Sequence, residues 1–196
     1  RGLGDVYKRQ YYDTAGVKVR YPFGFGMSYT TFEYSDLAVT DKGVTLTVKN
    51  TGNRDGAEVV QLYVGLPSSK LIRAKKELKG FKKVFIKAGG SVKVEIPFDE
   101  RTFRYFNVST DKWEIEGGKY SIMIGASVED IRLTAELDVK GTTDVNPYEG
   151  VALDSYFSGK AADVGIEEFK ALLSCGLEKY RYPVPSPNFK FYKKKR

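Results

Sequence analysis

The stretch IRLTAELDV (131–139) decides the fold class, because apolar and polar residues alternate along it without a break. Every second residue from Ile131 to Val139 is apolar, so these side chains would share one face of a β-strand. The same period of two recurs in four earlier runs, at 44–48, 60–66, 92–98 and 120–124. Such alternation is typical of antiparallel sheets packed on one side, so each strand should have one buried face and one solvated face.

Turn signals separate these runs and indicate how many strands there are. The turns contain glycine and lie at 41–43, 50–53, 89–90 and 116–118. Two further strands are expected near Phe32–Val39 and Leu78–Ile86. About seven short strands with no helical pattern between them predict an all-β, immunoglobulin- or fibronectin-III-like antiparallel sandwich over residues 31–140. The residues expected in its core are Val44, Leu46, Val48, Val60, Leu62, Ile122, Ile124, Leu133 and Leu137.

The two ends of the chain lack the alternation of apolar and polar residues seen in the centre. Residues 1–10 fit no periodic template, and we interpret them as a non-native or linker-derived end. Residues 141–162 are expected to form a loop, and apolar residues at helical spacing then predict a short helix at about Gly165–Ser174. The remainder of the segment 141–196 is rich in proline and ends in basic residues, so an extended tail is expected.

Composition excludes several classes of function. The 196 residues include no histidine and one cysteine, Cys175, so a Ser-His-Asp triad, a Cys-His pair and a disulfide framework within one chain are excluded. The single thiol favours a reducing, cytoplasmic location. No run of apolar residues is long enough to cross a membrane. The net charge of +7 is the sum of +2 in residues 1–10, +4 in 151–196 and +1 between them, so the predicted sandwich should not bind nucleic acid.

Acidic pairs are the first candidates for catalytic residues. Asp99–Glu100 and Glu129–Asp130 flank predicted strands, and adjacent carboxylates in turns do not face each other across a cleft, so we interpret them as solvated turns. The acidic residues in general are expected on solvated surfaces, with ordinary pKa values. The basic run Lys70–Lys87 holds eight Lys and Arg residues against Glu77. We interpret it as a strand with a solvated lysine face, in which Leu78, Phe81 and Phe85 supply the apolar pattern.

Aromatic and polar side chains near residue 110 are candidates for binding. Trp113, Tyr105 and Phe106 could stack on a sugar ring, but large aromatic residues dominate protein cores, so a packing role for Trp113 is favoured. Asn107-Val108-Ser109 fits a glycosylation sequon and is expected to be unused. Cys175 has no histidine to activate it and is interpreted as a plain thiol.

Several longer motifs carry a family resemblance. They occur in order and in register over residues 11–139 and read YYDTAGVKVR (11–20), YPFGFGMSYTTFEYSDL (21–37), VKNTGNRDGAEVVQLYV (48–64), KELKGFKKVFIKAGGSVKVEIPF (76–98) and WEIEGGKYSIMIGASVEDI (113–131). Together they resemble family-three glycoside hydrolases of the β-glucosidase and β-xylosidase type. The resemblance implies that residues 11–30 are the end of a preceding α/β domain with its junction motif, and that residues 31–140 are the fibronectin-III-like domain.

The resemblance also implies where the chemistry lies. Family members hydrolyse terminal β-linked sugars with retention, using an Asp in a barrel domain and a Glu in the α/β domain. No position here matches either residue, so we expect no catalytic residue, no cofactor site and no metal site in this chain. The expected role is an accessory domain that braces its partners, the barrel and α/β domains. The alternatives are a carbohydrate-binding or substrate-entrance module with oligosaccharide as a partner, and a stand-alone adhesion or scaffolding sandwich. The sugar is left open.

Overall fold

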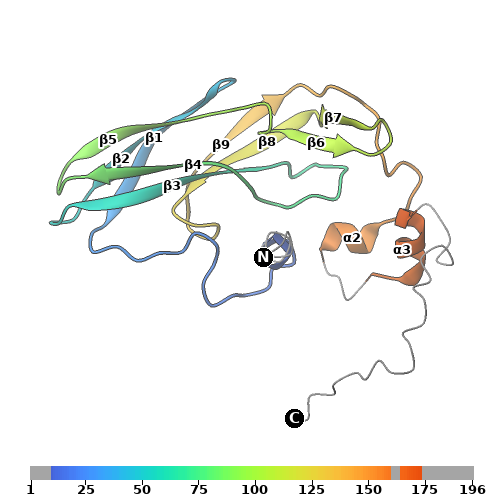
Figure 1. Cartoon of the computed structure of the whole chain (residues 1–196), viewed down its shortest axis with the longest axis horizontal. Coiled ribbons are helices and arrows are strands. Elements are labelled where there is room, and N and C mark those ends of the chain that lie inside the picture. Colours follow the sequence, from blue (N-terminus) through green and yellow to red (C-terminus); the bar gives the residue numbers. More distant parts are fainter. Residues whose placement is uncertain (1–9, 160–163, 174–196) are drawn as a thin grey trace, which may run out of the picture.

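The computed structural model describes residues 10–159 and 164–173, and its central part is a sandwich of two antiparallel sheets (Figure 1). The three-stranded sheet has the order β1-β2-β5, with β1 (Phe32–Thr40), β2 (Gly43–Asn50) and β5 (Ser91–Pro97). The four-stranded sheet has the order β4-β3-β8-β9, with β3 (Gly56–Gly65), β4 (Glu77–Ile86), β8 (Gly118–Gly125) and β9 (Ile131–Val139). The predicted all-β sandwich is confirmed.

The core lies between the two sheets and is formed by the alternating apolar residues. Seven of the nine predicted core residues are at most 1% exposed, namely Val44, Leu46, Val48, Val60, Leu62, Ile122 and Ile124. The other two, Leu133 and Leu137, are half-buried against this cluster. Both lie on β9, which has a neighbour on one side only, so its inward face is covered less completely than that of a central strand.

One strand departs from the expected pattern of one dry face and one wet face. In β3, every residue from Val60 to Gly65 is buried, so Gln61 and Tyr63 are buried although they point away from the core. The reason is tertiary: β3 is a central strand, and the segment before β1 crosses its outer side (Figure 1). The buried polar groups of Gln61 and Tyr63 pair with each other there, because the Tyr63 hydroxyl donates a hydrogen bond to Gln61 Oε1 at 2.6 Å.

Outside the sandwich, the described structure contains helical residues at 10–14, a hairpin and two short helices. A hairpin of β6 (Arg104–Asn107) and β7 (Lys112–Ile115) was not predicted from the sequence. The helix α2 (Asp154–Ser158) lies in a segment that was expected to be loop, so that expectation is wrong. The helix α3 (Ile166–Leu173) occupies the place of the predicted helix. The predicted extended tail after α3 lies outside the described residues, as do residues 1–9. Within the described residues, no helix is long and apolar enough to span a membrane.

Candidate docking surface on the outer face of the four-stranded sheet

The segment before β1 is held against the outer face of the four-stranded sheet by specific contacts. The Phe23 carbonyl accepts a hydrogen bond from the Val128 backbone N–H at 3.0 Å. Gly24 has a φ of 82°, and a β-carbon there would collide with the amide of Gln61. Gln61 in turn donates to the Ala126 carbonyl. A glycine is required here because the backbone adopts the left-handed region and passes directly over a buried side chain.

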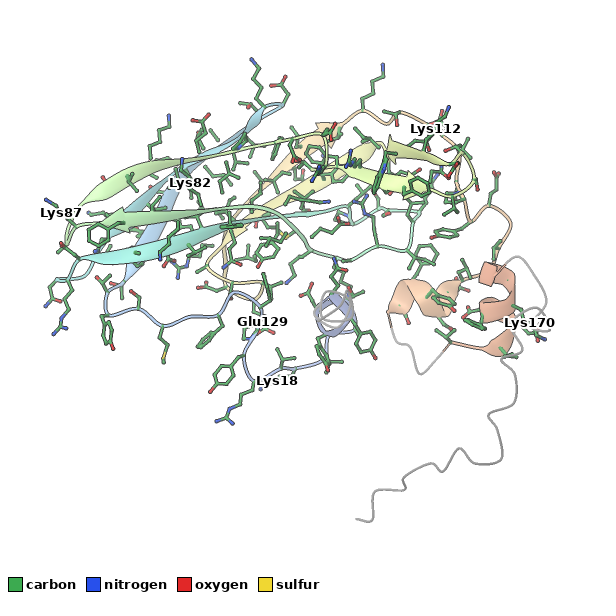
Figure 2. All side chains as sticks on the ribbon, viewed as in Figure 1. Lys18, Lys82, Lys87, Lys112, Glu129 and Lys170 are labelled. Carbon is green, nitrogen blue, oxygen red and sulfur yellow. The ribbon has the colours of Figure 1, made fainter. Side chains whose placement is uncertain are left out.

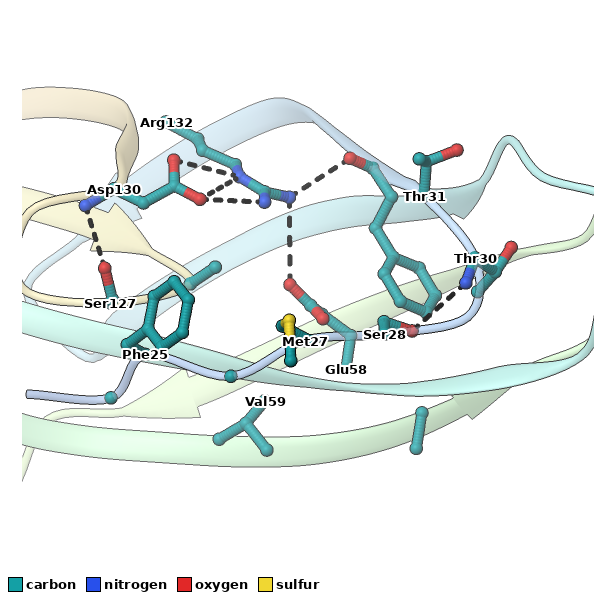
Figure 3. Close-up of a pocket in the computed structure, with 15 residues that line it drawn as sticks. Phe25, Met27, Ser28, Thr30, Thr31, Glu58, Val59, Ser127, Asp130 and Arg132 are labelled. Atoms are coloured by element: carbon teal, nitrogen blue, oxygen red, sulfur yellow. Dashed lines mark hydrogen bonds and ion pairs between the residues drawn. The ribbon is translucent and has the colours of Figure 1, made fainter. Parts of the chain in front are cut away.

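A pocket lies between this segment and the sheet (Figure 3). Phe25 and Met27 form one wall, and Val59 on β3 forms another. Its charged wall is built around Arg132, which contacts Asp130 at 2.9 Å and Glu58 at 3.7 Å. These apolar and charged walls are contributed by three parts of the chain that are far apart in the sequence.

The charged wall is internally satisfied. The Tyr34 hydroxyl donates to Glu58 Oε1 at 2.8 Å, and the Arg132 guanidinium lies 4.6 Å from the centre of the Tyr34 ring. Burial raises the pKa of Glu58, although the Tyr34 hydrogen bond and the Arg132 charge oppose this effect. Burial also raises the pKa of Tyr34, so its hydroxyl stays a donor at neutral pH. The cluster therefore pins β1, β3 and β9 together at one edge of the sandwich.

Apolar side chains on the outer face continue beyond the pocket onto β4. Phe81 and Phe85 are 68% and 66% exposed, and their register partners on β3 are Gln61 and Ala57. We define the junction face as the exposed apolar residues of this region: Tyr21, Phe23, Phe25, Met27, Tyr29, Val59, Phe81 and Phe85. Single exposed apolar side chains are ordinary, but a gathering of this size on one side of a domain is typical of a contact surface.

The aromatic residues of β4 correct one expectation from the sequence. The basic run does contain an edge strand, but Phe81 and Phe85 point away from the core together with Lys83, whereas Val84 and Ile86 pack inward. Lys82 pairs with the inward-facing Val60 and so lies on the other side of the strand, and Lys87 follows the end of β4 (Figure 2). The outer face of the strand therefore presents Lys83 between two aromatic side chains, in place of the expected lysine face.

A second charged cluster fixes the loop between β3 and β4. Glu77 contacts Arg73 at 3.0 Å and Lys79 at 2.7 Å, and its side chain is 19% exposed. Burial works to raise the pKa of Glu77, but the two cations together lower it. Glu116 accepts hydrogen bonds from the Ser69 hydroxyl at 2.6 Å and the Lys70 N–H at 2.7 Å. The expectation that all acidic residues are solvated with ordinary pKa values is thus wrong for Glu58 and Glu77.

The two acidic pairs singled out from the sequence lie in exposed turns. Asp99 accepts hydrogen bonds from the Thr102 hydroxyl and the Arg101 N–H, and the Thr102 bond is the main reason its pKa is lowered. Glu100 pairs with Arg104 at 3.2 Å. Glu129 and Asp130 are exposed in the turn between β8 and β9 (Figure 2). Among the described residues, no group of three or more His, Cys, Asp or Glu side chains could hold a metal ion.

The aromatic candidates lie on the β6–β7 hairpin and outside the core. Trp113 is 59% exposed and Phe106 is 44% exposed, so Trp113 is not a core residue, but its ring packs on Phe106 within the hairpin. Tyr105 lies on the other side of the hairpin, where it contacts Asn107. Asn107 is fully buried, and its amide donates to Glu114 at 2.7 Å and to the Val145 carbonyl at 3.0 Å. A buried, hydrogen-bonded amide cannot accept a glycan without local unfolding. Cys175 lies outside the described residues.

The sequence of the sandwich matches a known domain family. Residues 58–128 match the model described as the fibronectin type III-like domain. The sandwich is a fibronectin type III-like domain. This match spans β3 to β8 and includes Gln61, Tyr63, both aromatic residues of β4 and the β6–β7 hairpin. The resemblance to family-three glycoside hydrolases is confirmed, because the fibronectin type III-like domain matches the accessory domain of their β-glucosidases.

Relatives place this fibronectin type III-like domain within longer enzymes. An exo-α-(1→6)-L-arabinopyranosidase of Bifidobacterium longum is 45% identical over 143 residues, which are 70% of this chain and 19% of the relative. The thermostable β-glucosidase B of Acetivibrio thermocellus is 42% identical over 144 residues, or 69% of this chain and 19% of the relative. The crystal structure of the family-three β-glucosidase of Bifidobacterium adolescentis is similar with a TM-score of 0.65 at 38% identity, over 75% of this chain and 23% of that one. The chain thus spans about one fifth of the length of these curated relatives.

Proposed function

We propose that this fibronectin type III-like domain braces the barrel and α/β domains of a family-three glycoside hydrolase. The observation that carries the proposal is the junction face, where Phe81 and Phe85 are about two-thirds exposed and Met27 and Tyr29 are 93% and 91% exposed. Such side chains are costly to leave in water, at about 1.5–3 kcal/mol for each one that could be buried. A surface of this kind is explained when other domains of the same protein cover it.

The relatives support a structural role over a role in choosing the sugar. One is named for releasing L-arabinopyranose and another for acting on β-glucosides, yet both match this chain at similar identity. A domain that selected the sugar would be expected to differ more between them. We therefore propose that the protein hydrolyses terminal sugars with residues of its other domains, and that residues 31–140 contribute no catalytic group.

The boundaries proposed from the sequence follow the same division. We propose that residues 11–30 are the end of the α/β domain and its junction, and that residues 31–140 form the accessory domain. The contacts of Phe23 and Gly24 with the sheet support a junction that is packed onto the domain it introduces. Leu153 in the following segment is 2% exposed, which supports a folded unit that continues beyond residue 140.

An exchange experiment tests the bracing role. The matching segment of the A. thermocellus β-glucosidase would be replaced by residues 10–159 of this chain, and the melting temperature and activity of the chimera would be measured. We expect the double change Phe81→Lys and Phe85→Lys to lower the melting temperature of the chimera by several degrees, because it charges a covered surface. The same change in the isolated chain should have almost no effect. Val108→Lys is the matched control, since Val108 is 70% exposed but lies on the hairpin. Equal effects in both settings would contradict the proposal.

The isolated chain is expected to hydrolyse no aryl glycoside. Retaining hydrolysis needs two carboxyl groups about 5–5.5 Å apart across the scissile bond, one of them kept protonated. Glu58 and Glu77 have shifted pKa values, but each is committed to its own ion pair and hydrogen bonds. Turnover of chromogenic β-glucosides or β-xylosides that disappears on changing one carboxylate would contradict this expectation.

A second candidate function is the binding of oligosaccharide, and one observation favours it. Trp113 and Phe106 form an exposed aromatic pair, with ring centres 5.4 Å apart. The third candidate, a stand-alone adhesion or scaffolding sandwich, is disfavoured by the junction face, which such a protein would leave bare.

A further inference from the structure

The β6–β7 hairpin presents an aromatic surface on its solvent side. Phe106 and Trp113 are register partners, and their rings meet edge to face with an interplanar angle of 72°. The guanidinium of Arg104 lies 4.5 Å from the centre of the Trp113 ring. Trp113 is nevertheless more than half exposed. We call Arg104, Phe106 and Trp113 the hairpin platform.

The hairpin platform is held rigidly from behind. On the opposite side of the hairpin, buried Asn107 bonds to Glu114 and to the carbonyl of Val145. At the base of the hairpin, Phe103 packs against Tyr120 with ring centres 5.0 Å apart, and Tyr120 is fully buried in the core. A binding surface that is ordered before the ligand arrives loses less entropy when it binds. The exposed rings are therefore not the result of a loose turn.

The platform is separate from the junction face and much smaller. In Figure 1, the hairpin and the stretch that leads directly into β1 lie toward opposite ends of the sandwich. The platform offers two rings, and its Arg104 pairs with the exposed carboxylate of Glu100 at the border. A stable protein interface needs about 800 Å² on each partner, and its centre is depleted of charge. Two rings with a charged border suit a ligand of about the size of one ring.

The chemistry of the platform matches a pyranose. The C–H groups on one face of a pyranose form an apolar surface that packs on an aromatic ring, while its hydroxyl groups need hydrogen-bonding partners at the rim. Arg104 has five N–H donors, and one of its nitrogens contacts Glu100 at 3.2 Å. Its other donors can reach hydroxyl groups beside the indole. Small-molecule sites typically combine such an apolar contact with a few polar groups that fix orientation.

We propose that the hairpin platform is a stacking site for one pyranose unit of an oligosaccharide, with Trp113 as the stacking residue and Arg104 as the donor at its rim. The proposal rests on the proposed function, because the surrounding enzyme would bring oligosaccharides to this surface. It assigns the site a role in holding saccharide chains.

Trp113 is the only tryptophan of the chain, so its fluorescence reports on this site alone. The full chain would be titrated with cellotetraose, and we expect a saturable change in emission with a dissociation constant on the order of 1 mM, as for a single stacked ring. Sorbitol at matched concentration is the ligand control, since it carries hydroxyl groups but no ring. A flat titration, or an equal response to sorbitol, would overturn the proposal.

Variants then assign the effect to the platform. Phe106→Ala keeps the reporter and should weaken binding several-fold, whereas Phe81→Ala, which removes a still more exposed ring from the junction face, should leave the dissociation constant unchanged. Trp113→Ala should weaken binding about tenfold by saturation-transfer NMR, equivalent to about 1.4 kcal/mol. If Trp113→Ala leaves saccharide binding intact but lowers the melting temperature of the chimera, the platform is a domain contact and the proposal is wrong. If the chain does not bind saccharide, the test of the bracing role by the exchange experiment is unaffected.

Discussion

β3 and β4 are neighbouring strands of one sheet, yet their outer faces differ. On β3, Gln61 and Tyr63 are buried on the outer face, and Gly24 of the segment that precedes β1 passes directly over Gln61. On β4, Phe81 and Phe85 are two-thirds exposed although they are more apolar than Gln61. A polar residue is covered and two aromatic residues are bare, which is the reverse of what hydrophobicity alone would produce. The difference supports the proposal that other domains of the protein cover the outer face of β4.

Each of the two strands also carries a part-buried carboxylate, and the pKa values of the two carboxylates are shifted in opposite directions. Glu58 on β3 has one distant cation at 3.7 Å, so burial dominates and its pKa is raised. Glu77 on β4 has two cations within 3.0 Å, so its pKa is lowered in spite of burial. The number and distance of the cations decide the sign of the shift, because burial acts in the same direction on both carboxylates.

The largest expected effect is on the inner face of β3. Leu62→Ala should lower the free energy of unfolding by about 2–5 kcal/mol, because Leu62 is fully buried between the sheets. Leu133→Ala is the matched control, and its smaller loss should reflect the half-buried position on β9. Denaturant unfolding of each variant measures the difference. A loss below about 0.5 kcal/mol for Leu62→Ala would contradict the assignment of the core.

Glu77→Gln should have the next largest effect, and it should depend on pH. At pH 7 the loss should be about 1–3 kcal/mol, because Arg73 and Lys79 lose a charged partner. Since the folded pKa of Glu77 is below its ordinary value of 4.5, its contribution is present above that pH and is lost as the pH falls through the folded pKa. The free energies of unfolding of the variant and of the original chain should therefore become similar at low pH.

Two further variants check the sign of that pH dependence. As the pH rises above 4.5, Glu58→Gln should become more stable relative to the original chain. The reason is that a raised folded pKa makes ionisation of Glu58 unfavourable to folding. Glu95→Gln is the control, since Glu95 is exposed on β5. Melting temperatures recorded from about pH 3 to pH 7 would show these trends, and parallel curves for all three variants would refute the electrostatic contrast between β3 and β4.

Gly24→Ala should lower the free energy of unfolding by a moderate amount, and it tests whether the segment before β1 packs over β3. A methyl group there would meet the Gln61 amide while the backbone has a φ of 82°, so a loss of about 1–2 kcal/mol is expected. Gly26→Ala is a close control, because a β-carbon at Gly26 has no atom within 4 Å. Unfolding measured by urea would separate the two. Equal effects would mean that the segment does not hold its position over Gln61.

The smallest expected effect is on the outer face of β4. Phe81→Ser in the isolated chain should change the free energy of unfolding by less than about 0.5 kcal/mol, because the ring is 68% exposed and contributes little to the core. The measurement is again denaturant unfolding, with solubility followed in parallel. A loss above about 2 kcal/mol would show that Phe81 packs within the chain, and the contrast between β3 and β4 would be lost.

The features that the sequence did not predict are either short elements or depend on which face of a strand a side chain occupies. The strands β6 and β7 have four residues each, too few for alternation to be distinguished from loop. The helix α2 has five residues, and Leu153 at its start provides no side-chain cap. In β4, the apolar residues at 81, 84, 85 and 86 belong to both faces, so the pattern alone could not show that Phe81 and Phe85 point outward.

The sequence by itself determined the seven strands of the sandwich, the turns between them and most of the core, because alternation along one strand dictates which side chains can share a face. It also carried the family, through long motifs in register. Only the tertiary structure decided that Gln61 and Tyr63 are covered, that Phe81 and Trp113 are exposed, and that Glu58 and Glu77 are part-buried. The physical reason is that solvent exposure and pKa depend on which distant segment packs over a side chain, and no local pattern contains that information.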